Sequence, residues 1–126
     1  MEVEGAGDAG RGAGAIDEDM DRAAELFGVL ANAHRLKIIR RLADRELDVG
    51  QLATALDFNQ PNVSQHLRRL RDDGIVVSQR HGSRVVNRLS TPLTTALCEL
   101  GCRLAAELDP SRPEHRPNQA KETEKR

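Results

Sequence analysis

At 126 residues the chain has the length of one domain, and with 38% hydrophobic but only 2% aromatic residues its core must be small and aliphatic. No window of about 18 apolar residues exists and the first residues are acidic, which argues against a membrane partner and a signal peptide; the two cysteines then indicate a soluble, cytoplasmic protein. The net charge of −1 gives by itself no reason to expect a nucleic-acid partner.

The chain begins and ends in segments of low complexity. Residues 1–16 are rich in Gly, Ala and Glu without an apolar period, and residues 109–126 contain three prolines and almost no apolar side chains. We expect both segments to be disordered tails. One folded domain is left over residues 17–108.

Helix-capping signals predict three helices in the first half of this domain. Asp17 can cap a first helix over residues 17–31, and Asn32 can cap a second with one apolar face. Asp48 is followed three residues later by Gln51, which is the pattern of a capping box. This pattern predicts a third, short helix.

A fourth helix is expected after a tight turn. Asn59 can cap it, Pro61 is tolerated in its first turn, and Gly74 supplies a stop at its C-terminal end. Its buried stripe consists of three apolar residues at helical spacing: Val63, Leu67 and Leu70.

The rest of the domain reads as a hairpin and a last helix. Residues 75–80 and 84–89 are β-branched runs joined by His81-Gly82-Ser83, which predicts two strands. Thr91 and Pro92 then mark the cap and first turn of a helix over residues 91–108. The expected fold is therefore mainly α with a small β-hairpin, in the order four helices, two strands, one helix.

The charge is distributed unevenly along the chain. Residues 1–25 hold eight acidic and two basic side chains, whereas residues 60–88 hold six arginines against two aspartates. A polar helix face is by itself more often only solvated. Two short helices, a tight turn and a basic hairpin together, however, are the parts that place one helix in a DNA major groove and a loop on the flanking backbone.

The apolar stripe of the fourth helix determines which of its residues point outward. Asn and Gln can read adenine edges and Arg can bind guanine bidentately, and residues near the helix start are the ones presented to bases. At 100° per residue the outward or flanking side chains are Asn62, Ser64, Gln65, Arg68 and Arg69. At the hairpin tip, Arg80, His81 and Arg84 suit phosphates or the minor groove.

Three stretches carry a resemblance to a known family. They are LANAHRLKIIR (residues 30–40), NQPNVSQHL (residues 59–67) and RHGSRVVNRL (residues 80–89). Together they resemble the ArsR/SmtB-type winged helix-turn-helix repressors of bacteria, over about residues 25–107. The resemblance implies a homodimer that sits on an inverted-repeat operator in double-stranded DNA and leaves it when an inducer binds.

The resemblance also assigns residues to the recognition helix. In the family's pattern these positions match Gln60, Asn62, Ser64, Gln65, His66 and Arg68, although His66 flanks the apolar stripe and can instead pack. No catalytic arrangement stands out, because Ser64 and His66 diverge by about 200° on a helix. We therefore do not expect an enzyme.

The sensor sites that the resemblance implies are missing here. An arsenic-type thiolate pair would need cysteines near residues 47–51, where Asp48 and Gly50 stand. A zinc-type site on the last helix would need His or Asp, and residues 93–108 contain neither. A persulfide-type pair would need a cysteine in residues 32–44, which have none.

Cys98 and Cys102 are the thiols that remain. Their i, i+4 spacing puts both on one side of the last helix, about 6 Å apart between Cα atoms. Three interpretations stay open: small hydrophobes in a tight interface, a site for a thiophilic metal or metalloid, or a redox pair. None of these three interpretations requires a cofactor.

The last helix has two apolar faces. We assign its leucine stripe, which consists of Leu93, Leu97, Leu100, Leu104 and Leu108, to the subunit's own core and first helix. A second stripe of small residues is expected to pair with its two-fold mate. The predicted dimer interface consists of Leu26, Phe27, Leu30, Thr94, Cys98, Gly101, Cys102 and Ala105.

One alternative from another functional class remains. A winged helix can serve as a protein-interaction module, in which case the basic helix would meet an acidic partner instead of an operator. Binding of duplex DNA at low salt distinguishes a repressor from a protein-interaction module.

Overall fold

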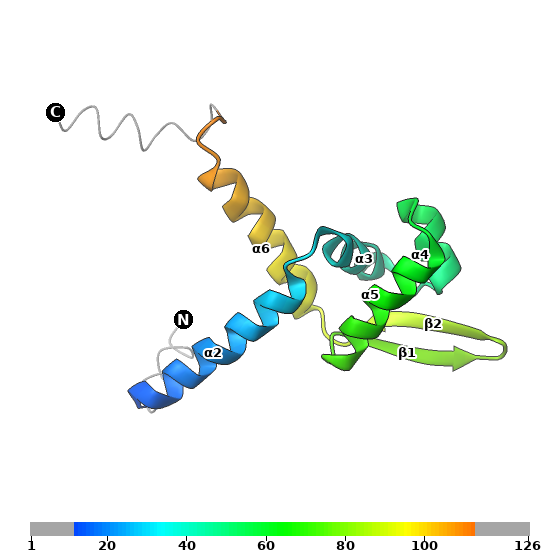
Figure 1. Ribbon diagram of the computed structural model, residues 1–126, viewed down its shortest axis with the longest axis horizontal. Coiled ribbons are helices and arrows are strands. Elements are labelled where there is room, and N and C mark those ends of the chain that lie inside the picture. The colour runs from blue at the N-terminus through cyan, green and yellow to red at the C-terminus, as the bar shows by residue number, and fades with distance from the viewer. Residues whose placement is uncertain (1–11, 113–126) are drawn as a thin grey trace.

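The computed structural model describes residues 12–112. In chain order these residues form α2 (Ala13–Leu30), α3 (Ala33–Asp44), α4 (Val49–Leu56), α5 (Gln60–Asp72), β1 (Val76–His81), β2 (Arg84–Leu89) and α6 (Leu93–Leu108). The predicted order of helices and strands is confirmed. Helices α3, α4 and α5 and the hairpin gather at one end of the molecule, and α2 and α6 diverge from it (Figure 1).

The two predicted tails lie mostly outside the described residues. Of the segment predicted as an N-terminal tail, residues 13–16 already belong to α2. The prediction that Asp17 caps this helix is therefore wrong: the cap position is Gly12, which makes no side-chain hydrogen bond. Ala13 and Ala15 favour helix, and the single Gly14 disfavours it without preventing the earlier start.

The caps predicted at Asn32 and Asn59 are confirmed, because each side chain accepts a hydrogen bond from a free backbone amide. The Oδ1 atom of Asn32 accepts a hydrogen bond from the Arg35 amide at 3.1 Å, and that of Asn59 accepts one from the Asn62 amide at 2.8 Å. At α6 the assigned helix begins at Leu93, two residues later than expected. The prediction of Thr91 as cap and Pro92 in the first turn is wrong, because the cap position is Pro92; Thr91 Oγ1 accepts the Leu93 amide at 3.2 Å from one residue further out.

The core is aliphatic and lies between α3, α4, α5 and the hairpin. Its fully buried side chains are Ile38, Ile39, Leu52, Val63 and Leu70. The predicted stripe of α5 is thus confirmed, because Leu67 is buried with Val63 and Leu70. Helix α5 is thereby held in one rotation about its axis.

The hairpin is antiparallel, with a register that runs from Val76 opposite Leu89 to His81 opposite Arg84. Its turn is made at Gly82, and Gly74 ends α5; both have positive φ, 67° and 76°, which glycine adopts without strain. A two-residue turn follows from this register. The hairpin is a wing that extends away from the helices (Figure 1).

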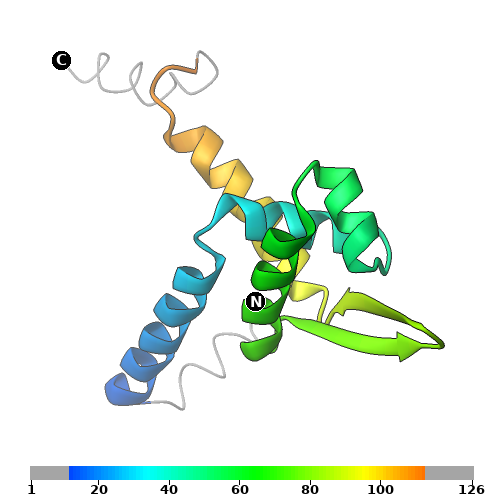
Figure 2. The same cartoon turned by 45° about the vertical axis from the view of Figure 1, so that its right-hand side comes forward.

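The assignment of the leucine stripe of α6 to the subunit's own core is wrong. Leu93, Leu100, Leu104 and Leu108 are 73%, 56%, 55% and 70% exposed, and of this stripe only Leu97 packs against the core. The reason is visible in both views, where α6 leaves the body of the domain and α2 points in another direction (Figure 2). The apolar face of α6 that carries Leu100 and Leu104 is therefore uncovered in the single chain.

None of the described helices has the length and apolar character needed to cross a bilayer.

Candidate nucleic-acid interface

The outward face of α5 carries the polar side chains that the sequence predicted. Burial of Val63, Leu67 and Leu70 turns the opposite side of the helix to solvent. The exposed residues there are Gln60, Asn62, Ser64, Gln65, Arg68 and Arg69. Arg69 forms an exposed ion pair with Asp73 at 2.9 Å. Within residues 12–112 the side chains of Asn62, Gln65 and Arg68 have no protein hydrogen bond, so they are available to a ligand.

The turn between α4 and α5 presents the first turn of α5. Asp57 adopts the left-handed conformation, with φ 57° and ψ 41°, and the Phe58 amide donates to the Ala53 carbonyl oxygen at 3.0 Å. The cap at Asn59 then starts α5 directly. Helices α4 and α5 therefore form a helix-turn-helix in which Gln60 and Asn62 stand at the exposed N-terminal end of the second helix.

His66 lies on a different side of α5 from these residues. Its ring is half-buried, accepts a hydrogen bond at Nδ1 from Arg35 Nε at 3.4 Å, and stacks on His34 with 5.5 Å between ring centroids. Burial, and then the charges of Arg35 and His34, lower the pKa of His66. The structure thus places His66 in the junction between α3 and α5 rather than with the outward residues.

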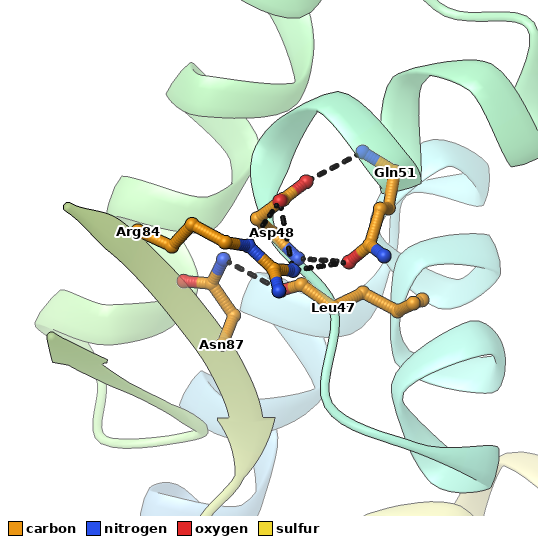
Figure 3. A network of polar contacts seen from close by, with 5 residues as sticks. All are labelled: Leu47, Asp48, Gln51, Arg84 and Asn87. Atoms are coloured by element: carbon orange, nitrogen blue, oxygen red, sulfur yellow. Dashed lines mark hydrogen bonds and ion pairs between the residues drawn. The ribbon is translucent and has the colours of Figure 1, made fainter. Parts of the chain in front are cut away.

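The wing divides its basic residues between two environments. Arg80 and His81, next to the turn, are exposed. Arg84 instead reaches the head of α4, where its guanidinium lies 2.9 Å from Asp48 Oδ2 and 3.1 Å from Gln51 Oε1 (Figure 3). The pKa of Asp48 is lowered by the hydrogen bond from the Gln51 amide and further by Arg84. The predicted capping box of Asp48 and Gln51 is confirmed. The sequence did not predict that Arg84 contacts both of these residues.

A buried asparagine also connects the wing to the helices. Asn87 is 3% exposed; its Nδ2 donates to the Leu47 carbonyl oxygen at 3.1 Å and its Oδ1 accepts from Ser78 Oγ at 2.6 Å. Arg71 of α5 donates to Ser78 Oγ at 3.4 Å. These contacts link the wing to α5 and to the segment just before α4. In the sequence, the only indication of this buried role is that Asn87 is a polar residue within a β-branched run.

Comparison with known proteins identifies the family. A family model described as bacterial regulatory protein, arsR family, matches residues 32–78. The transcriptional activator HlyU of Vibrio cholerae is 37% identical over 89 residues, which cover 71% of this chain and 82% of HlyU. The chain belongs to the arsR family. The resemblance that the sequence carries is thereby confirmed.

Two further members show how far this similarity extends. The arsenical resistance operon repressor of Escherichia coli is 43% identical to this arsR-family chain over 67 residues, covering 52% of the chain and 57% of the repressor. The homodimeric winged helix-turn-helix DNA-binding domain of a possible ArsR-family regulator from Mycobacterium bovis superposes with a TM-score of 0.65 at 31% identity, covering 76% and 90%. The winged helix-turn-helix fold is confirmed.

The two cysteines of this arsR-family chain lie beside the uncovered apolar face. Cys98 is half-buried and packs against the core, and burial raises the pKa of its thiol, as do Cys102 and Glu99. Cys102 is exposed, and both residues line an apolar hollow with Phe27. Within residues 12–112 no group of three or more His, Cys, Asp and Glu side chains could hold a metal ion. The thiol site stays a prediction.

Proposed function

We propose that this chain is a sequence-specific DNA-binding transcriptional repressor that acts as a homodimer on an inverted-repeat operator. The observation that carries the proposal is the outward face of α5, the second helix of the helix-turn-helix, where Asn62, Gln65 and Arg68 are exposed and have no hydrogen-bond partner among residues 12–112. These side chains have the donors and acceptors that read bases in the major groove. Membership of the arsR family supports the same conclusion.

The rest of the surface has a supporting role in this proposal. Arg80 and His81 on the wing and Arg69 on α5 would meet phosphates, which provide affinity but carry no sequence information. Repression would follow from occupation of the operator, as the name of the Escherichia coli relative suggests. A bacterial repressor works where the chromosome lies, so we place this chain in the cytoplasm.

The uncovered apolar face supports the homodimer. Phe27 on α2 is 52% exposed, and Leu100 and Leu104 on α6 are 56% and 55% exposed. A second copy would cover these residues together with Leu26, Gly101, Cys102 and Ala105, whereas Leu30 and Thr94, also predicted at the interface, are already buried within the chain. The Mycobacterium bovis relative is a homodimer. Two copies would place their recognition helices in successive major grooves, about 34 Å apart.

Selection from a random duplex library, followed by a salt titration of the selected site, tests the proposal. We expect a palindromic consensus and an affinity that falls steeply with salt, because bound phosphates release counterions. The double substitution Gln65→Ala and Arg68→Ala should abolish discrimination between the selected site and random DNA. Lys37→Ala, which removes one charge from an exposed position of α3, serves as the matched control. Failure to bind any duplex at about 50 mM salt would overturn the proposal and favour a protein-interaction module.

A further inference from the structure

The wing is attached to the segment before α4 at its base. The Leu47 amide donates to the Asn87 carbonyl oxygen at 3.1 Å, and the Asn87 amide donates to the Leu47 carbonyl oxygen at 2.8 Å. The buried Asn87 side chain adds a third bond to the same carbonyl oxygen. The base of β2 therefore cannot move without α4, but these bonds do not determine the direction of the wing beyond Asn87.

A second attachment lies nearer the tip, at Arg84. Its two acceptors are already oriented by the capping box, in which Asp48 Oδ1 accepts the Gln51 amide at 2.7 Å and Gln51 Oε1 accepts the Asp48 amide at 2.9 Å (Figure 3). Arg84 thus meets a carboxylate and an amide oxygen that are fixed to the head of α4. A charged donor facing preset acceptors is a directional contact.

The register of the hairpin separates Arg84 from Arg80. Arg84 stands opposite His81, and Arg80 stands opposite Val85. Direct partners share a face of an antiparallel pair, and successive residues alternate between faces, so Arg80 and Arg84 lie on opposite faces of the wing. The Arg84 side chain reaches Asp48 and Gln51 at the head of α4, whereas the Arg80 side chain is exposed to solvent.

We propose that Arg84 is a positioning residue: its contacts with Asp48 and Gln51 fix the wing tip relative to α5, and it is not itself a DNA contact. The inference rests on the proposed function. A cation that is compensated by a carboxylate at 2.9 Å has few counterions to release when a phosphate approaches. Movement of Arg84 to a phosphate would also leave Asp48 unpaired beside the negatively charged backbone.

The salt dependence of operator binding distinguishes a positioning residue from a phosphate contact. Arg80→Gln should lower affinity and reduce the slope of log K against log salt by about 0.9 per protomer, or about 1.8 for the proposed dimer. Arg84→Gln should lower affinity by up to about fivefold per protomer, the range of one exposed ion pair, with the slope of the wild type. A slope reduced in Arg84→Gln as in Arg80→Gln would overturn the inference.

Hydrogen exchange of the wing tests the anchor without DNA. Asp48→Asn keeps a cap for α4, because asparagine also accepts the Gln51 amide, but it removes the charge that Arg84 faces. We expect faster exchange of wing amides in Asp48→Asn and in Arg84→Gln, and no acceleration in the double variant beyond that of Arg84→Gln, because Arg84→Gln already removes the contact with Asp48.

Arg88→Gln is the control for the exchange experiment, because Arg88 is an exposed wing arginine that donates a hydrogen bond of 3.4 Å to the Leu89 carbonyl oxygen next to it. The wing amides of the Arg88→Gln variant should exchange at the rates of the wild type. Additive acceleration in the double variant, or wild-type exchange in both single variants, would overturn the inference. A wild-type chain that binds no duplex would overturn the proposed function, and the exchange result would still decide on the anchor.

Discussion

Arg35 donates a hydrogen bond of 3.4 Å from Nε to Nδ1 of His66, a bond that exists only while that ring nitrogen is unprotonated. The same guanidinium donates from Nη1 to the Val29 carbonyl oxygen at 2.7 Å. One side chain of α3 therefore connects the end of α2 to the middle of α5. Protonation of His66 at Nδ1 would break this contact between α3 and the helix proposed to read DNA.

Acidification should destabilise the protein through His66. Burial lowers the pKa of this residue in the folded chain below its ordinary value of 6.5, so the unfolded chain takes up the proton first. The free energy of unfolding should fall as the pH drops from above 6.5 through the lower folded pKa. Urea unfolding at about pH 7.5 and pH 5.5 measures this loss.

The control for this prediction is His66→Gln, whose amide oxygen can accept the Arg35 hydrogen bond but does not titrate. The other three histidines of the chain are present in both proteins. The wild type should lose more stability than His66→Gln over the same pH interval. Equal losses would mean that His66 does not control the pH dependence.

The cap of α5 should affect stability and DNA binding separately. Asn59→Ala removes the acceptor for the Asn62 amide and should lower the free energy of unfolding by about 1 kcal/mol. Asn59→Asp keeps an acceptor and should keep the stability, but it adds a negative charge beside the residues proposed to meet DNA. Denaturant unfolding and operator titration measure the two effects. Loss of stability in Asn59→Asp would contradict the explanation by capping.

The caps at Asn32, Asp48 and Asn59 could be predicted because each involves only residues three positions apart. The outward face of α5 could be predicted for a similar reason, since one stripe of apolar residues determines the opposite face. Arg84 and Asp48 are 36 positions apart, and several other arginines and acids could have formed the pair. The sequence therefore indicated a basic wing but not which arginine holds it.

The leucine stripe of α6 shows a second limit of the sequence. Helical spacing identifies Leu100 and Leu104 as parts of one apolar face, but it does not say whether the same chain or another copy covers that face. From the sequence alone, the stripe is assigned to the chain's own core. The structure leaves it exposed because α6 contacts the domain mainly through α3 near its beginning and then extends away from it.

The buried side chain of Asn87 should be important for stability. Asn87→Ala removes its bonds to the Leu47 carbonyl oxygen and Ser78 Oγ, and should lower the free energy of unfolding by about 1–3 kcal/mol. Arg88→Ala, at the neighbouring exposed position, should change it by no more than about 0.5 kcal/mol. Thermal and urea unfolding compare the two variants. Equal stability of both would contradict the role given to Asn87.

Charges on the leucine stripe should produce a monomer. Leu100 and Leu104 are more than half exposed within one chain, so Leu100→Glu with Leu104→Glu should leave the fold intact and prevent a second copy from covering α6. Sedimentation velocity should give the mass of one chain, and circular dichroism should give unchanged helix content. Glu99→Gln, on the same helix, should remain dimeric. A dimer in the double variant would place the interface elsewhere.

The two thiols should differ in reactivity once α6 is uncovered. Burial raises the pKa of Cys98, so less of its reactive thiolate is present, whereas Cys102 is exposed. In the Leu100→Glu, Leu104→Glu chain, iodoacetamide should therefore label Cys102 faster than Cys98, as followed by mass spectrometry of the two modified sites. In the wild type the labelling of Cys102 should be slower than in this variant, because the second copy would cover it. Labelling of Cys102 at the same rate in both chains would remove this residue from the proposed interface.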